Sequence, residues 1–112
     1  MMKAIISDLM KRIPGKASEE WPMGEPFVQA FAHGSMSVEV YAPKGIDIQT
    51  PHDQDELYFI HSGRGEFVVG GDRHPFEPGM VFFVAAHVEH RFENFSPDFS
   101  TWVVFWGPKG GE

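Results

Sequence analysis

The chain has 112 residues, 42% of them hydrophobic, which is enough for one core and too little for two ordinary domains. The formal net charge of -7 and nine scattered Lys and Arg residues give no basic stripe, which argues against nucleic acid as a partner. Cysteine is absent, so disulfides and thiolate metal sites are excluded and the redox compartment stays open.

The N-terminal segment predicts a short amphipathic helix. Apolar residues recur with helical spacing within residues 4–12, and Pro14-Gly15 ends the pattern. Asp8 and Lys11 interrupt this segment, which makes it too short for a signal-peptide core or a membrane span. We therefore expect a cytoplasmic protein without a membrane partner, in which residues 1–26 form a helix and an arm outside the main body.

Short segments rich in β-branched and aromatic residues follow, and each has the length of a strand. They are residues 27–31, 35–41, 57–61, 66–69, 80–84 and 101–106. Glycine- and proline-rich turns separate them, and no long helical crossover intervenes. This spacing predicts an all-β, antiparallel sandwich or barrel over residues 27–107, within a single domain of residues 1–112.

Two polar segments stand out among these strands, Thr50-Pro-His-Asp-Gln-Asp-Glu56 and His90-Arg-Phe-Glu-Asn94. Together they offer two imidazoles and a carboxylate, a set that zinc and non-haem iron accept with positions left open for water or substrate. His52, Glu56 and His90 are therefore the candidate metal ligands.

The same residues carry a resemblance to the small single-domain cupins over residues 45–94. Two glycine-bounded motifs in the right order support it, through Gly45, His52, Glu56, Gly63, Gly79, His90 and Asn94. The resemblance implies a jelly-roll barrel, also called a double-stranded β-helix. It also implies one divalent transition metal per chain, of which Fe, Zn, Mn, Ni and Cu all suit these ligand types.

The chain also departs from the family pattern. Thr50 stands where the first histidine of a His-x-His pair belongs, so the usual four-ligand set is reduced to three. Ala85 and His87 stand where the second motif has Pro and Gly, so a small conformational cost is expected at His87.

The polar neighbours of the candidate ligands allow several roles. Gln49, Thr50 and Gln54 are oxygen donors that could act as a weak fourth ligand or hold the histidines in place. His87 could turn toward the site, although an exposed loop residue is the simpler interpretation. A site without metal, in which His52 and Glu56 are ordinary turn and strand-end residues, is the alternative.

Strand alternation predicts which side chains face the barrel interior. Residues 53–55 are expected to form a tight turn, so that His52 closes one strand and Glu56 opens the next. If Glu56 faces inward, Tyr58 and Ile60 do so too, whereas His61 faces outward. Aromatic residues make up 14% of the chain, and they suit a cavity wall as well as the core of a small barrel.

The last strand, residues 101–106, is apolar on both faces, which predicts a homodimer interface. Two functions fit the whole pattern. The first is a metal-dependent enzyme acting on a small organic molecule, of dioxygenase, isomerase, decarboxylase or lyase type, in which Tyr58 is a candidate for moving a proton. The second is a small-ligand-binding or sensing module without catalysis.

Overall fold

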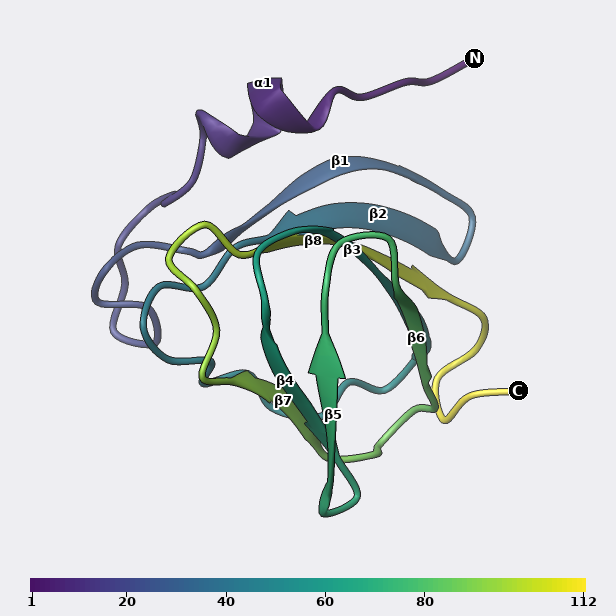
Figure 1. The fold of residues 1–112 in the computed structure, drawn as a ribbon. Coiled ribbons are helices and arrows are strands. Elements are labelled where there is room, and N and C mark those ends of the chain that lie inside the picture. The colour runs from purple at the N-terminus through teal and green to yellow at the C-terminus, as the bar shows by residue number, and fades with distance from the viewer.

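Eight antiparallel strands form two facing sheets in the computed structural model, which describes residues 1–112 (Figure 1). The first sheet has the order β1-β2-β8-β3-β6 and the second the order β5-β4-β7. The strands are β1 (Phe27–His33), β2 (Met36–Tyr41), β3 (Asp55–Ser62), β4 (Gly65–Val69), β5 (Asp72–Phe76), β6 (Val81–Val84), β7 (His90–Glu93) and β8 (Ser100–Trp106). One short helix, α1 (Ile6–Met10), precedes them, so the all-β prediction is confirmed.

Tight glycine turns make the hairpins that fold each sheet. Gly70 and Gly71 join β4 to β5 with φ values of 57° and 88°. Two successive residues with positive φ are what a two-residue hairpin turn of matching twist requires, and glycine adopts this conformation without steric strain.

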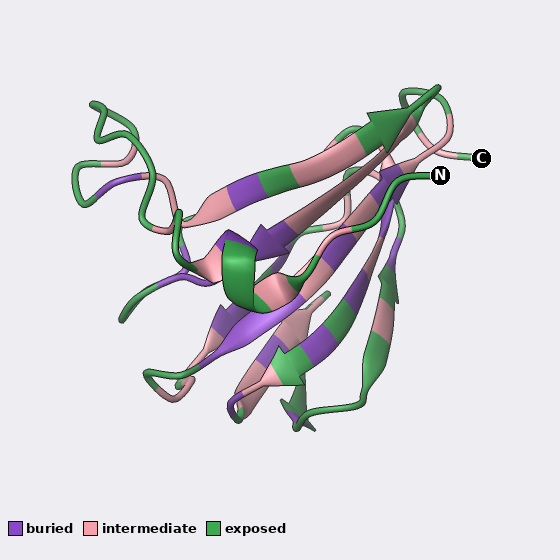
Figure 2. Ribbon diagram, turned by 90° about the horizontal axis from the view of Figure 1, so that it is seen from above, coloured by how far each residue is buried: buried purple, intermediate pink, exposed green.

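The main core lies between the two sheets and is largely aromatic. Tyr58 from one sheet and Phe67 and Phe92 from the other are each about 1% exposed. Their rings pack edge to face or tilted, with centroids 4.8 to 5.6 Å apart, as aromatic pairs prefer. Side chains alternate between inward and outward along these strands, visible as the alternating buried and exposed bands in Figure 2. The predicted inward set of Glu56, Tyr58 and Ile60 and the exposed His61 are confirmed.

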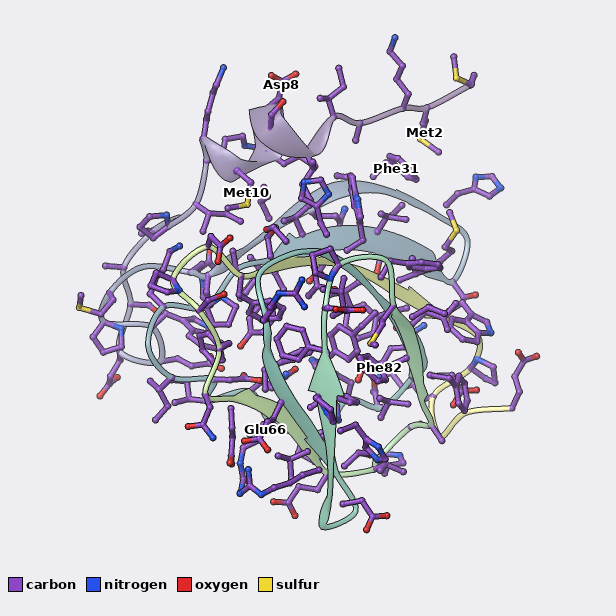
Figure 3. The ribbon with its side chains drawn as sticks, in the orientation of Figure 1. Met2, Asp8, Met10, Phe31, Glu66 and Phe82 are labelled. Atoms are coloured by element: carbon purple, nitrogen blue, oxygen red, sulfur yellow. The ribbon has the colours of Figure 1, made fainter.

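A second, smaller core lies outside the five-stranded sheet. Leu9 of α1 packs there against Val28 and Val40, with Trp102 at its margin. In Figure 3, Met10 points from α1 toward the sheet, whereas Asp8 points away from it. The helix is shorter than the predicted 4–12, but it covers part of the outward face of β8. This covering accounts for some of the apolar character of that strand.

Two sequence predictions were wrong about local structure. β5 was not predicted, because Asp, Arg, His and Pro are poor strand formers. It exists as an edge strand, with no further strand on its outer side. Pro75, which has no backbone N–H to donate, is tolerated at such an edge. His52 does not close a strand, since residues 42–54 form a loop and β3 begins at Asp55.

The outward face of the five-stranded sheet carries two apolar rows that cross all five strands. One row contains Phe31, Val38, Val104, Leu57 and Phe83, and the other Val28, Val40, Trp102, Phe59 and Val81. Helix α1 covers the Val28 and Val40 end, whereas Phe59, Val81 and Phe83 remain 42%, 53% and 59% exposed. None of the helices in the structure is long and apolar enough to cross a membrane.

Candidate metal centre

Three side chains converge inside the barrel from a loop and from both sheets. Glu56 is the second residue of β3, and strand alternation turns it inward. His90 opens β7 in the facing sheet, and His52 lies in the loop that precedes β3. One ligand atom of each of these residues lies within 4.8 Å of the others. The structure thus brings together the three residues that the sequence selected.

The Glu56 carboxylate stands between the two imidazoles. Its Oε1 lies 2.8 Å from His90 Nε2 and 3.4 Å from His52 Nδ1. The Glu56 and His90 side chains are both 1% exposed, whereas that of His52 is 37% exposed. Ligand atoms about 2.0–2.2 Å from one tetrahedral zinc ion are roughly 3.4 Å apart, so shifts of the order of 1 Å would bring these atoms to the spacing that zinc needs. The partly exposed His52 marks the side from which the cluster can be reached.

Two polar atoms of this cluster are buried without a hydrogen-bond partner, His52 Nδ1 and Glu56 Oε2. A buried polar atom without a partner is costly, and most folded proteins provide one. A divalent cation held by this cluster would give both atoms a partner. The residues present therefore fit a metal ion on their own chemistry.

The His90 ring is held in the orientation that a ligand needs. Its Nδ1 lies 2.8 Å from the backbone carbonyl oxygen of Val88, which only accepts hydrogen bonds. Nδ1 therefore carries a proton, which leaves Nε2, the nitrogen that faces Glu56, as the ring atom that can bind a metal once it loses its own proton. A second hydrogen bond of this kind, which fixes tautomer and ring angle, is common for metal-binding histidines.

The pKa values of Glu56 and His90 shift in opposite directions. Burial alone raises the pKa of Glu56, but the close imidazoles of His52 and His90 outweigh it and bring this pKa below its ordinary value. Burial likewise lowers the pKa of His90, but the Glu56 carboxylate reverses the effect and the pKa is raised overall. Without a metal, the two residues thus favour a carboxylate and imidazolium pair.

A hydrogen-bonded chain leads from the cluster to a second buried carboxylate. The Tyr58 hydroxyl lies 2.9 Å from His90 Nε2 and donates to Gln49 Oε1 at 3.0 Å. The side-chain amide nitrogen of Gln49, Nε2, donates to Asp47 Oδ2 at 2.7 Å. Asp47 is 5% exposed and also accepts from the Tyr41 hydroxyl and from the backbone N–H of Phe92. This chain fixes the position of the Tyr58 hydroxyl beside the cluster.

Tyr58 is held as a neutral phenol. Burial raises its pKa well above the ordinary value, and the nearby negative charges of Glu56 and Asp47 add to the effect. In this environment the hydroxyl keeps its proton, so it is a weak acid that donates hydrogen bonds.

Comparison with known families agrees with this geometry. The family model described as "Cupin domain" matches residues 37–106, which include β3 to β8, all but the first residue of β2 and all three clustered residues. The chain belongs to the cupin family. The predicted resemblance is thereby confirmed, and the two facing antiparallel sheets are those of a cupin barrel.

Relatives of this cupin vary in how much is known of them. An uncharacterized protein of Streptomyces coelicolor, SCO3923, is 39% identical over 85 residues, covering 74% of this chain and 81% of that protein. The HTH-type transcriptional activator RhaS of Mannheimia succiniciproducens is 35% identical over 57 residues, 51% of this chain but only 21% of that protein. The crystal structure of TT1209 from Thermus thermophilus has a TM-score of 0.67 at 21% identity, covering 95% and 97% of the two chains.

The loop that carries His52 is held by backbone contacts from elsewhere in the cupin barrel. The N–H of His87 donates to the carbonyl oxygen of His52 at 2.7 Å, and the N–H of Ala86 donates to Asp55 Oδ1 at 2.9 Å. His87 has the expected left-handed backbone, with φ of 67°, and it is exposed. His87 thus supports His52 through its main chain, and its imidazole lies outside the cluster that the structure brings together.

The three further oxygen donors lie in different places. Gln49 accepts a hydrogen bond from Tyr58, and Tyr58 lies beside His90, so Gln49 reaches the cluster only through Tyr58. Gln54 instead donates to the carbonyl oxygens of Ser35 and Gly107, both at 3.0 Å, and ties the loop to the end of the barrel. Thr50, which replaces the first histidine of the motif, is exposed.

A cavity of about 180 Å³ opens beside the cluster, against the inner face of the first sheet, and Trp21 of the N-terminal arm adds to its wall. Its lining residues are Trp21, Phe27, Glu39, Tyr41, Gln49, His52, Tyr58, Val103 and Phe105. A separate apolar cavity of about 240 Å³ lies between the arm and the loop after β2, with Lys44 as its one charged residue. Of the two, only the first adjoins the candidate ligands, so it is the candidate substrate cavity.

Sequence reasoning missed three residues of this site. Asp47 lies in a loop whose sequence gives no period from which its burial could be predicted. Glu39 could have been found, because it alternates with Val38 and Val40 in a predicted strand and must face the opposite side. Trp21 reaches the cavity from the arm, a long-range contact that no local pattern encodes.

Proposed function

We propose that this cupin binds one divalent transition metal through His52, Glu56 and His90 and acts as a metal-dependent enzyme on a small organic molecule. The observation that carries the proposal is the pair of buried donor atoms without partners, His52 Nδ1 and Glu56 Oε2, in one cluster that borders a cavity. Three protein ligands leave coordination positions open, as catalytic sites require.

A bound metal and the residues around the cluster would have separate roles in the reaction. A bound metal would supply a Lewis acid for an oxygen atom of the substrate or for water. Tyr58, a neutral phenol positioned by Gln49, would turn its hydroxyl hydrogen from Gln49 to the substrate and donate a hydrogen bond or, where the reaction makes the substrate strongly basic, a proton. The aromatic cavity wall would exclude water and hold the apolar part of the substrate.

Turnover by metal-loaded protein tests this function. Samples loaded separately with Fe²⁺, Zn²⁺, Mn²⁺, Ni²⁺ or Cu²⁺ would be incubated with a panel of small metabolites, and products and oxygen uptake measured. We expect turnover with one metal and at least a tenfold lower kcat for Tyr58→Phe with unchanged metal content. Saturable binding of a metabolite without turnover under any of these metals would contradict catalysis.

That result would favour the second function, a sensing module that binds a small ligand. The similarity to part of the transcriptional activator RhaS supports this alternative. The same cavity would then hold the ligand, and binding would have to change the contacts of this cupin with another protein.

We further propose that the chain forms a homodimer through the outward face of the five-stranded sheet. The uncovered part of that face, around Phe59, Val81 and Phe83, presents neighbouring exposed apolar side chains. The two rows described above contain no charged side chain that would repel a second copy. A two-fold axis would place this face against itself.

A further inference from the structure

Glu39 is a carboxylate of the barrel interior that the proposed metal centre does not use. It lies directly opposite Val103 in the register of β2 and β8, and Val103 belongs to the core between the sheets. Its side chain therefore faces the cavity, of which it is a lining residue. Glu39 forms no ion pair or hydrogen bond with another side chain, and its electrostatic neighbours are His52 and Glu56.

The rest of the cavity wall is rich in aromatic rings. Trp21, Phe27, Tyr41, Tyr58 and Phe105 all line it, and no Lys or Arg does. Trp21 and Phe27 form an edge-to-face pair with centroids 5.8 Å apart, so the arm adds to the wall supplied by β1. Aromatic faces carry partial negative charge and attract cations, most strongly where water is excluded.

The cavity therefore brings together two kinds of group. His52, which lines it, belongs to the cluster that would hold a metal able to attract an oxygen donor. Glu39, which lines it too and has His52 and Glu56 as its electrostatic neighbours, is a carboxylate among aromatic rings without a basic side chain. The volume of about 180 Å³ is below the roughly 300–1,000 Å³ of sites for drug-sized ligands, so the ligand is small.

We propose that the cavity recognises a small zwitterion, with its cationic ammonium group at Glu39 and the aromatic wall and its oxygen donor directed toward His52, Glu56 and His90. The placement of the oxygen donor rests on the proposed metal centre. The placement of the cation rests on Glu39 and the aromatic wall alone, so it is tested separately.

Two isosteric probes isolate the cationic group. Trimethylglycine and 3,3-dimethylbutanoate have the same shape and the same carboxylate, and they differ in whether the branched end is a cationic nitrogen or a neutral carbon. Titration calorimetry would measure both against Zn²⁺-loaded and metal-free protein. We expect trimethylglycine to bind at least tenfold more tightly in both forms, with both probes weaker when the metal is absent.

The variants assign this preference to named residues. Glu39→Gln is expected to reduce the preference at least fivefold while the metal content stays unchanged, whereas Glu77→Gln, which removes an exposed charge far from the cavity, leaves the preference as it is. Trp21→Leu changes the N-terminal arm and leaves the strands of the barrel as they are. It is expected to weaken the binding of trimethylglycine more than the binding of 3,3-dimethylbutanoate.

Several outcomes would overturn the proposal. Equal affinities for the two probes, or no binding of either, would exclude a cation site. A preference that survives Glu39→Gln would place the cation elsewhere, and loss of metal in that variant would make Glu39 a ligand of the metal centre. Absence of metal from every sample would contradict the proposed centre, yet a preference for trimethylglycine would still support the cation site.

Discussion

His90 and Glu56 stabilise each other's charged forms, and a metal ion would compete with that pairing. Because the pKa of His90 is raised, Nε2 keeps its proton to higher pH than an ordinary histidine, and binding must release it. We predict that Zn²⁺ binding releases about one proton below the pKa of His90 and fewer above it. Calorimetry in two buffers of different ionisation enthalpy measures this number. A proton count independent of pH between about 6 and 9 would contradict the assignment of His90.

The same pair makes the stability of the metal-free protein depend on pH. The pKa of His90 is higher in the folded state, so its contribution is complete below about pH 6.5, the ordinary histidine value, and is lost as the pH rises through the raised pKa. The pKa of Glu56 is lowered, so its contribution is present above about pH 4.3 and is lost as the pH falls through the lowered value.

His87 is a residue at which main chain and side chain have separate roles. Its N–H holds the His52 loop, and its φ of 67° suits glycine better than histidine. We predict that His87→Gly and His87→Ala both keep the metal, and that His87→Gly unfolds at a temperature at or above that of the native protein. Metal content and thermal unfolding measure the two effects. Loss of metal in either variant would make the imidazole a ligand.

The loop of residues 42–54 depends on one buried carboxylate for its shape. Asp47 accepts hydrogen bonds from Gln49, Tyr41 and the N–H of Phe92 in β7. Asp47→Asn turns one acceptor into a donor, and we predict a loss of about 2 kcal/mol in unfolding free energy. Because the hydrogen bonds of Gln49 connect Tyr58 to Asp47, metal affinity should also fall, by about tenfold or more.

Denaturant unfolding and metal titration measure both quantities. Asp72→Asn, at the exposed first residue of β5, is the control and should change stability by less than about 0.5 kcal/mol. Equal effects of the two substitutions would show that Asp47 does not hold the loop.

Elements whose structure is set by neighbouring residues could be predicted from the sequence, whereas those set by long-range contacts could not. Glu56 was selected through its motif, and strand alternation then correctly placed Tyr58 and Ile60 on the same side of β3. β5 could not be predicted, because an edge strand tolerates Pro75 and polar residues that elsewhere mark a turn. The two histidines were selected through their motif, but the loop conformation of His52 depends on distant backbone contacts that have no sequence pattern.

For the molecule as a whole, the uncovered sheet face makes the dimer testable. Phe83, 59% exposed on the edge strand β6, belongs to the uncovered apolar group that forms the proposed interface. We predict that Phe83→Glu converts a dimer into a monomer in light scattering, because the interface would bury an unpaired charge. His74→Glu, on the exposed strand β5 of the other sheet, should remain dimeric. A native protein that scatters as a monomer would contradict the dimer.

The N-terminal arm and the barrel share one cavity, since Trp21 lines it together with residues of four strands. We therefore propose that residues 1–26 and 27–107 act as one domain of residues 1–112. The cytoplasmic location expected from the sequence stays a prediction.

The metal content of tag-free protein tests the central claim most directly. Inductively coupled plasma mass spectrometry would compare native protein, Glu56→Gln, His90→Gln and the control Glu77→Gln, each after the same loading and desalting. We predict close to one equivalent of one metal in native protein and in Glu77→Gln, and at least a tenfold loss in the two cluster variants. No metal in any loaded sample, or equal metal in all four proteins, would contradict a metal centre at His52, Glu56 and His90.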